Sequence, residues 1–511
     1  MRFEKTWTVL SIFALILLAL AEALTVAIIL KMNMLPIKYV AVLVALMAVI
    51  VVVEALFFFV KVNGSVALAR RIIACVLALL LVCFCAYISK NVALAHKVLE
   101  NVTNNGINTE LSTDGKDMCV LVRADDPAKE LKDTANYSFG VIENHDVSRV
   151  NKFVEWIGKQ TGTTPAPSGY VHAKELANAL LDKKVDAIII SGATLSLLLD
   201  EEAYENFLDK VRILAAISYS SLEGKPPQPE KPEDEEVNPE KNVTNTPFVI
   251  YISGSDTRSS MLDRSRSDVN ILMVVNPVTK QVLLLNTPRD YYVGNPHYDG
   301  SLDKLTHCGL FGVDCSMEAL GNLYGTEIKY YGQINFTGFE TLIDSIGGIT
   351  VYSEKAFKAW GTPIKKGENH LNGKQALSFA RERYHLSGGD NDRGKNQMKV
   401  IEAVIKKMTT GTTIISNYAA IMKSLEGMFA TNMQSSEISS LVKMQLNDLA
   451  TWDVFKFAVT GTGGSEVTAS MPGVKAYVMY PNQKSVDHAS ALVEKILSGT
   501  ILKKEDIEMP K

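Results

Sequence analysis

The chain has little of what marks several common classes of enzyme. Its 511 residues include six cysteines, eight histidines and four tryptophans. There is no H-E-x-x-H motif of a zinc protease and no G-x-S-x-G motif of an α/β-hydrolase. His307, His370 and His385 do not have the spacing of metal ligands. A formal net charge of −4 gives no general reason to expect a nucleic-acid partner.

Only two of the cysteines raise a question of chemistry. The other four lie in apolar or strand-like runs and are expected to act as small apolar residues: Cys75, Cys83, Cys85 and Cys119. Cys308 and Cys315 flank the segment GLFGVD. A zinc site would need more ligands than the neighbouring His307 supplies. Outside the cell a disulfide could persist, so a bridged pair and two free thiols both agree with the sequence.

Long apolar runs are confined to the first 90 residues. They cover residues 7–30, 39–59 and 72–88, and the first two are long enough to cross a bilayer, while the third is at the short end of the range. Three such runs exclude a cleaved signal peptide. Flanking Lys and Arg residues favour a cytoplasmic N-terminus. With three spans, everything after about residue 90 would then lie outside the cell.

Two acidic residues, Glu22 and Glu54, fall within the first two apolar runs. An intramembrane carboxylate is costly and is a functional candidate. The alternative is a protonated side chain bonded to a neighbouring helix. By the rise per residue, Glu22 belongs to the outer half of the membrane and Glu54 to the inner half. We therefore expect no direct contact between them.

The sequence predicts four regions: three transmembrane helices over 1–90, a connector and accessory α/β domain over 91–220, a linker over 221–247 and a second α/β domain over 248–511. The linker has six prolines, many acids and almost no large apolar residue, so it cannot bury a core. In the accessory domain, Asp125, Asp126 and His145 stand apart from any motif, and we expect them in solvated turns. The segment 461–465, GTGGS, is predicted to be a mobile loop because it lacks the rest of a P-loop.

The fold class predicted is α/β throughout, with a central mixed sheet flanked by helices in the last domain. Strand-like runs such as FVIYISG and QVLLLNTP alternate there with helical patterns such as NQMKVIEAVIKKM. Arginines and carboxylates stand at the ends of the apolar runs: Asp256, Arg258, Arg266, Asp268, Arg289, Arg381, Arg383, Asp390, Arg393 and Gln397. Strand ends open onto loops over the sheet edge, where α/β proteins place their sites.

These residue types suit a site that holds phosphate and a divalent cation. Arginines fork onto phosphate oxygens, and carboxylates bind a hard cation such as Mg²⁺. Arg381 and Arg383 could reach one site if their helix ends near Phe379, and Asp390 is expected to begin the next helix. Taken singly, each residue has a plainer alternative, such as a solvated turn aspartate or an exposed salt bridge.

Seven blocks of sequence, in this order and spacing, resemble the LytR–CpsA–Psr family: GSDTR at 254–258, RSD at 266–268, NTPRD at 286–290, DKLTH at 303–307, FTGFETLIDSIGGITV at 336–351, HLNGKQALSFARER at 370–383 and GDNDR at 389–393. The resemblance implies a membrane enzyme on the outer face of Gram-positive cells, of the capsule-biosynthesis branch. Such an enzyme transfers glycopolymer from a polyprenyl-diphosphate carrier to peptidoglycan. Capsule-assembly proteins are further partners to consider.

The resemblance also implies roles for single residues. Asp256 and Asp268 would hold Mg²⁺ or Mn²⁺. The diphosphate would be bound by Arg258, Arg266, Arg289, Arg381, Arg383, Arg393 and Gln397, with Asp268, Arg289 and Asp390 as the catalytic residues. Candidates to line a channel for the lipid are Phe336, Phe339, Leu342, Ile343 and Ile346, and an ordinary helix core is the alternative for each. Asn396 and Thr306 depart from the family pattern, where many members have Arg and Asn.

Two rival functions share these residues. One is a membrane-anchored regulator of capsule assembly without catalysis, and the other is a hydrolase in which water replaces the sugar acceptor. A role in binding DNA is not supported, because no basic recognition helix is found and DNA lies on the other side of the membrane.

Overall fold

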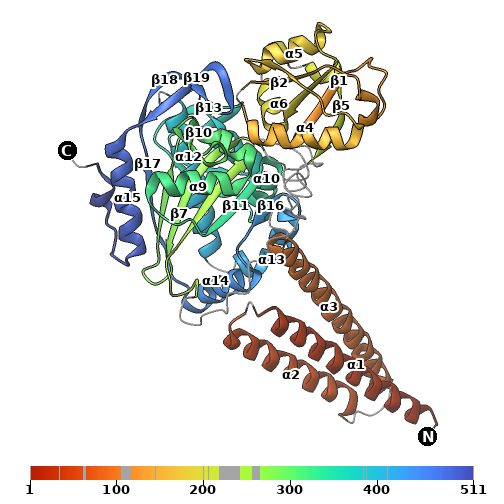
Figure 1. Cartoon of the computed structure of the whole chain (residues 1–511). Helices are drawn as coiled ribbons and strands as arrows, with labels where there is room; N and C mark the ends of the chain where they lie inside the picture. Colours follow the sequence, from red (N-terminus) through yellow and green to blue (C-terminus); the bar gives the residue numbers. More distant parts are fainter. Residues whose placement is uncertain are drawn as a thin grey trace.

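The computed structural model describes residues 2–33, 35–60, 65–104, 117–143, 145–199, 201–204, 206–217, 242–255, 265–383, 385–386, 388–410 and 413–509. Figure 1 shows three parts: a bundle of three long helices, an accessory unit (residues 117–217) and a main unit (residues 242–509). Most of the linker predicted at 221–247 lies outside the described residues. The α/β fold class is confirmed by the two mixed sheets with their covering helices.

The bundle consists of α1 (Arg2–Met32), α2 (Ile37–Phe59) and α3 (Ser65–Asn104). Each contains a stretch long and apolar enough to cross a membrane. Glu22 and Glu54 are both buried in the bundle. Glu22 lies near Cys85 of α3, and Glu54 lies near Cys75. These cysteines are ten residues apart, about 15 Å along the helix, which fits the expectation that the two carboxyls do not meet.

Helix α3 is longer than the span predicted from the sequence. Its 40 residues extend over about 60 Å, roughly twice the thickness of a hydrocarbon core. The last turns, with the buried residues Ala95, Val98, Leu99 and Val102, pack into the same hydrophobic cluster as Ile421 of the main unit. The third helix therefore joins the membrane bundle directly to the main unit, where the sequence suggested a polar connector.

The accessory unit is built on a five-stranded sheet of order β3-β2-β4-β1-β5. The strands are β1 (Met118–Arg123), β2 (Phe139–Ile142), β3 (Ser168–Tyr170), β4 (Ala187–Ser191) and β5 (Val211–Ile217), and β2 is parallel to both β3 and β4. Helix α4 (Val147–Thr161) covers one face, and α5 (Ala173–Leu181) with α6 (Gly192–Leu199) covers the other. Coverage on both faces explains the unbroken apolar runs of β1 and β4.

The main unit is built on a six-stranded sheet of order β16-β11-β6-β7-β8-β17. Its strands are β6 (Phe248–Ser255), β7 (Ser267–Asn276), β8 (Gln281–Asn286), β11 (Tyr330–Asn335), β16 (Phe429–Thr431) and β17 (Asp453–Ala458). The pairs β6–β11 and β8–β17 are parallel and the others antiparallel. One face packs against α9 (Val313–Tyr324) and α15 (Gln483–Leu497), the other against α12 (Asp390–Thr409) and α14 (Ser435–Asp448).

A third layer of helices connects this sheet to the bundle. It contains α10 (Phe336–Ser345), α11 (Gly373–Arg381) and α13 (Thr413–Leu425), and its core also includes small hairpins, β12 (Ile349–Ser353) with β15 (Gly367–Leu371) and β13 (Phe357–Ala359) with β14 (Thr362–Ile364). Lys38 Nζ and Tyr39 Oη donate hydrogen bonds to the carbonyls of Asn447 and Leu446, at 3.0 and 3.1 Å. The main unit thus contacts the ends of α2 and α3.

The prediction of a mobile loop at 461–465 is wrong. These residues begin β18 (Gly461–Thr468), which pairs with β19 (Met471–Pro481). A Cβ at Gly463 would lie 3.0 Å from the ring of Tyr477, and one at Gly464 would lie 2.2 Å from the ring of Tyr480. The glycines therefore leave room for tyrosine rings to lie across the strand, a use of strand glycine that composition alone does not distinguish from a loop.

The expectation of solvated turns for Asp126 and His145 is also wrong. The Asp126 carboxylate is almost fully buried and accepts hydrogen bonds from Tyr137 Oη and the backbone N–H of Ala128, at 2.8 and 3.0 Å. His145 is buried where the accessory and main units meet. Asp125, by contrast, is exposed, as expected.

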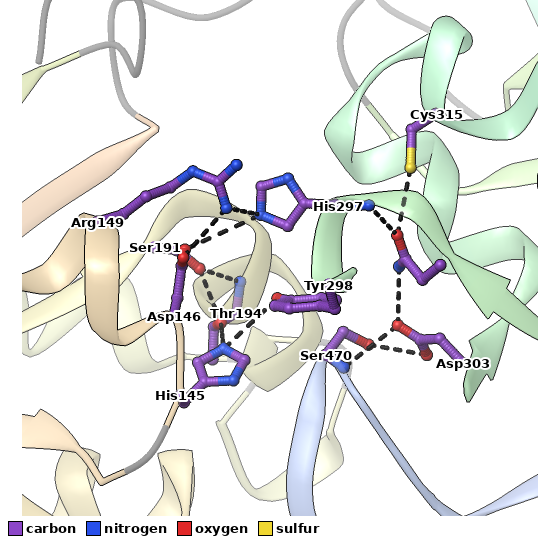
Figure 2. A network of polar contacts seen from close by, with 11 residues as sticks. His145, Asp146, Arg149, Ser191, Thr194, His297, Tyr298, Asp303, Cys315 and Ser470 are labelled. Carbon is purple, nitrogen blue, oxygen red and sulfur yellow. Dashed lines mark hydrogen bonds and ion pairs between the residues drawn. The ribbon is translucent and has the colours of Figure 1, made fainter. Parts of the chain in front are cut away.

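The junction between the two units is a closed network of polar side chains (Figure 2). Arg149 Nη1 donates to His297 Nε2 at 3.0 Å and also pairs with Asp146 at 3.1 Å. His145 Nε2 lies 3.5 Å from Tyr298 Oη and 3.3 Å from the hydroxyl of Thr194. His297 and Tyr298 belong to a short 3₁₀ turn, Pro296–Tyr298.

Further bonds continue the network into the main unit. Asn295 Nδ2 donates to the buried carboxylate of Asp303 at 3.1 Å, and His307 Nδ1 lies 2.7 Å from the same carboxylate. The thiol of Cys315 donates to Asn295 Oδ1 at 3.3 Å. Cys308 and Cys315 are free thiols in this structure, which agrees with the alternative that has no disulfide.

Candidate functional site

An apolar pocket of about 250 Å³ opens where β6 and β7 of the main sheet meet α10, α11 and α12. Much of its lining is aliphatic and comes from β6, β7, β11, α11 and α12: Ile252, Val269, Ile334, Leu377, Val400 and Ile401. Charged and polar side chains share the same cavity: Asp268, Arg289, Arg381, Arg383, Arg393 and Gln397. The pocket therefore combines a surface for a hydrocarbon with a cluster of arginines for an anion.

Most of the residues predicted to bind the diphosphate are brought together here. Arg289, Arg381, Arg383, Arg393 and Gln397 all line the pocket, although they are spread over more than 100 residues of sequence. Arg266, at the start of β7, is not among the lining residues. Asp256 and Arg258 lie outside the described residues.

Arg289 and Asp268 form the centre of the charged cluster. Arg289 follows the end of β8 and donates from Nη1 to Asp268 Oδ1 at 2.7 Å, with both side chains about one-fifth exposed. Its Nε lies 3.6 Å from Asp290, which also pairs with Lys304 at 3.2 Å. Burial by itself would lower the pKa of Arg289, but the carboxylates of Asp268 and Asp290 outweigh it and raise the pKa. The guanidinium is held in place and permanently charged.

The two arginines at the end of α11 reach the pocket because the helix stops between them. Arg381 is the last helical residue, and Glu382 is extended, with φ −67° and ψ 128°. On a continuous helix, residues two apart point in different directions, so the extended residue allows Arg383 to reach the same cavity. The helix was predicted to end near Phe379 and ends two residues later, at Arg381. As expected for a helix that stops in this region, Arg381 and Arg383 both reach the same cavity.

Helix α12 supplies the third side of the charged cluster. It begins at Asp390, as expected, and Arg393 on its first turn pairs with the Asp390 carboxylate. Burial raises the pKa of Asp390, and the nearby carboxylates of Asp290 and Asp268 raise it further, against the lowering effect of Arg393 and Arg289. A carboxylate with a raised pKa is a stronger base than an ordinary aspartate, so Asp390 is a candidate general base.

The next question is whether the charged cluster could hold a metal ion. Among the residues described, no group of three or more His, Cys, Asp or Glu side chains is close enough to hold one. Asp268 still fits Mg²⁺, which takes few protein carboxylates and fills its other positions with water and substrate phosphate. Burial is the main cause of the raised pKa of Asp390, and a divalent cation would offset the smaller contribution of the carboxylates of Asp290 and Asp268.

The predicted lipid-channel residues divide into two groups. Phe336 and Phe339 line the pocket. Leu342, Ile343 and Ile346 do not: Ile343 and Ile346 are fully buried in the cluster that also contains the end of α3, and Leu342 packs against that cluster. This division follows from helix geometry, because the first turn of α10 borders the cavity and the later turns point into the helical layer.

Sequence reasoning missed one prominent residue of the pocket, Trp360. It sits in the turn between β13 and β14 and is 56% exposed. Its ring lies 4.7 Å from the guanidinium carbon of Arg381, and the ring of Phe336 lies 4.4 Å from the same atom. The dipeptide Trp-Gly could have indicated a tight turn, but nothing local indicates that this turn reaches the arginines.

The two departures from the family pattern have visible consequences. Asn396 is buried, and its Nδ2 donates to the carbonyl of Phe379 at 3.4 Å, so it ties α12 to α11 and does not line the pocket. Thr306 is buried beside Arg289, and its backbone N–H donates to the Arg289 carbonyl at 2.8 Å. The Asn396 side chain thus joins α12 to the end of α11, whereas the contact of Thr306 with Arg289 is made by the backbone and does not depend on its side chain.

Comparison with known proteins gives the class of this chain. Residues 215–491, more than half of the chain, match the LytR_cpsA_psr family. The chain belongs to this family.

Among its curated relatives is the polyisoprenyl-teichoic acid–peptidoglycan teichoic acid transferase TagU of Enterococcus faecalis, 33% identical over 203 residues, which cover 39% of this chain and 66% of that protein. TagU of Bacillus licheniformis is 35% identical over 191 residues, covering 37% of this chain and 60% of that protein. The match spans less than two thirds of either relative.

Solved structures similar to the chain include Bacillus subtilis TagV, with a TM-score of 0.42, 25% identity and coverage of 50% of this chain and 98% of that chain. TagT bound to LIIa-WTA gives a TM-score of 0.42, 24% identity and coverage of 50% and 93%.

Proposed function

We propose that this protein is a membrane-anchored transferase that moves an anionic glycopolymer, such as capsular polysaccharide, from a polyprenyl-diphosphate carrier to peptidoglycan. The observation that carries the proposal is the pocket in which arginines and aliphatic side chains line one cavity. A diphosphate suits the arginines, and a polyprenyl chain suits the apolar lining, at about 0.8 kcal/mol for each CH₂ buried. The names of the TagU relatives agree with this substrate class.

The position of the pocket supports a lipid as the substrate. Phe336 and Phe339 of α10 line the cavity, while Ile343 of the same helix and Ile346 just after it share a hydrophobic cluster with the outer end of α3. A single helix of the main unit thus connects the pocket to the membrane anchor. With a cytoplasmic N-terminus and three spans, the main unit would work on the outer surface, where lipid-linked glycans are displayed.

The transfer step uses residues already described. A hydroxyl group of the peptidoglycan sugar attacks the phosphorus that bears the glycan, and the bond from that phosphorus to the bridging oxygen breaks. A phosphodiester forms, and polyprenyl phosphate leaves. Asp390, with its raised pKa, takes the proton from the hydroxyl. Arg289 and Arg393 stabilise the charge that develops on the leaving phosphate.

A divalent cation, Mg²⁺ or Mn²⁺, would be held by Asp268 together with Asp256, which is outside the described residues. When bound, it would neutralise charge on the diphosphate. Gln397 and Arg383 would orient the head group from the other side of the cavity. Capsule-assembly proteins are proposed as further partners on the basis of the family branch that the sequence resembles.

The test is a transfer reaction with the purified full chain, a polyprenyl-diphosphate oligosaccharide, peptidoglycan fragments and Mg²⁺. Transfer predicts glycan covalently attached to the fragments and an equal amount of polyprenyl phosphate released. Release of polyprenyl phosphate without glycan on the fragments would mean hydrolysis. Binding of the lipid with neither product would favour the regulator. Lys503→Ala, which removes an exposed cation far from the cavity in sequence, serves as the control variant.

A further inference from the structure

The turn between β13 and β14 carries an unusual residue. The register Ala359↔Thr362 leaves a two-residue loop of Trp360 and Gly361, with φ of 47° and 89°. Positive φ at both positions is the geometry of a type I′ hairpin turn, which prefers Asn-Gly. A bulky aromatic residue at positive φ is strained. The hairpin therefore keeps a tryptophan where asparagine would fit the backbone better.

The tryptophan side chain has a clear contact. The guanidinium carbon of Arg381 lies close to two rings, 4.7 Å from the centroid of the Trp360 ring and 4.4 Å from that of the Phe336 ring. Both distances are within the range of a cation–π interaction. Three elements meet at this contact, the β13–β14 turn, the first residue of α10 and the last residue of α11, and all three residues line the pocket.

A guanidinium held against two aromatic rings is restricted in its orientation. Arginine binds phosphate through its N–H groups, and a restricted orientation reduces the rotamer freedom lost on binding. Trp360 is 56% exposed, so its ring is not needed to fill a core. We propose that Trp360 is a positioning residue, which aligns Arg381 for the diphosphate of the lipid-linked substrate. The inference rests on the proposed function.

The substitution Trp360→Asn separates this role from a structural one. Asparagine suits the turn, so the variant is expected to unfold at the same temperature as the wild type or a higher one. Its dissociation constant for geranylgeranyl diphosphate, measured by calorimetry with the full chain in detergent, is expected to rise about tenfold. Trp360→Phe retains a flat ring and is expected to stay within about twofold of the wild type. Tyr352→Ala, at an equally exposed aromatic residue that does not line the pocket, is the matched control.

Two further measurements test whether Trp360 exerts its effect through Arg381. Arg381→Lys removes the flat guanidinium and is expected to weaken binding about tenfold, and adding it to Trp360→Asn should cause little further loss, because the two residues act as a unit. Geranylgeraniol, which has no phosphate, should bind all variants equally.

Unchanged diphosphate affinity in Trp360→Asn overturns the inference, as do additive losses in the double variant or an equal loss of affinity for the alcohol. Wild-type protein that binds no geranylgeranyl diphosphate overturns the proposed function itself, and the inference with it.

Discussion

Polar residues lie where strands end in both the main and the accessory unit. They are covered in the accessory unit and face a cavity in the main unit. In the accessory unit, His145 follows β2 and Ser191 ends β4, and the edge is covered by His297 and Tyr298 of the main unit (Figure 2). In the main unit, Asp268 near the start of β7 and Arg289 after β8 face an open cavity. The same position in an α/β fold has become an interface in one unit and a pocket in the other.

The charges at the two edges are balanced differently. At the junction, Arg149 is opposed by Asp146, and the imidazole of His297 accepts from the arginine as a neutral group. Among the described residues, the cavity is lined by four arginines and one carboxylate, that of Asp268. A polar network whose charges are paired with one another is typical of an interface. A cavity lined by an excess of positive charge is typical of a binding site for an anion.

The largest expected effect concerns Asp390. If it is the general base, Asp390→Asn should lower kcat about a hundredfold or more. Wild-type activity should rise with pH as the carboxyl, whose pKa is raised by burial and neighbouring carboxylates, loses its proton, and this limb of the profile should vanish in the variant. The rate of glycan transfer between pH 4 and pH 8 provides the measurement. An unchanged profile in Asp390→Asn assigns the base elsewhere.

A second change removes the centre of the arginine cluster. Arg289→Ala should lower kcat/KM for transfer about a hundredfold, because it deletes charge stabilisation of the leaving phosphate and leaves Asp268 unpaired. Arg149→Ala, at the junction, is the matched control and should retain most of the activity. Equal losses in the two variants would contradict the distinction between pocket and interface.

A third change fills the apolar part of the pocket. Ile401→Phe replaces an aliphatic side chain of the cavity lining with a larger aromatic one. The variant should bind geranylgeranyl diphosphate about tenfold more weakly. The effect on geranyl diphosphate should be smaller, because a shorter chain needs less of the cavity. Calorimetry with the two diphosphates gives the comparison. Equal losses for both chain lengths would indicate that Ile401 lies outside the path of the lipid.

The smallest effect is expected at the junction and depends on pH. Burial lowers the pKa of His145 and of His297, so the unfolded chain binds protons that the folded chain excludes. Stability is then constant above the ordinary histidine pKa of about 6.5 and falls as the pH drops below it. Asp146 and Asp303 have lowered pKa values, and their contribution is lost only below about pH 4.

Between pH 6.5 and 4.5 the two histidines are expected to lower the free energy of unfolding by about 1 kcal/mol as the pH falls. The raised pKa of Asp390 acts in the opposite direction, so the contribution of the histidines is the difference between the wild type and a variant that lacks them. Denaturant unfolding of the full chain across this interval is the measurement. The double variant His145→Gln and His297→Gln should show a smaller pH dependence, and an identical slope would refute the assignment.

Local pattern was enough to predict most of the fold. Apolar runs predicted the strands β6, β7, β8 and β11, because a sheet covered on both faces needs continuous apolar strands. The clustering of Arg289, Arg381 and Arg393 followed from their positions at element ends together with the family resemblance. Each of these signals is carried by residues close together in the sequence.

The errors arose where the decisive contact comes from far along the chain. His145 is buried by Tyr298, 153 residues away, so its surroundings have no local signal. Gly463 and Gly464 indicated a loop, but the rings of Tyr477 and Tyr480 explain them as strand residues. Ile343 and Ile346 were predicted as candidates to line a lipid channel, with a helix core as the alternative, and they lie in a core, because a helical pattern does not tell whether an apolar face borders a core or a cavity.

The most direct test of the account is photo-crosslinking of the full chain with a polyprenyl diphosphate that carries a diazirine near the end of its lipid. The account predicts crosslinks in peptides of α10 and α12, at Phe336, Phe339 or Ile401, and competition by unlabelled geranylgeranyl diphosphate. Crosslinks only in the membrane helices, or at the junction around His145 and Tyr298, would contradict it.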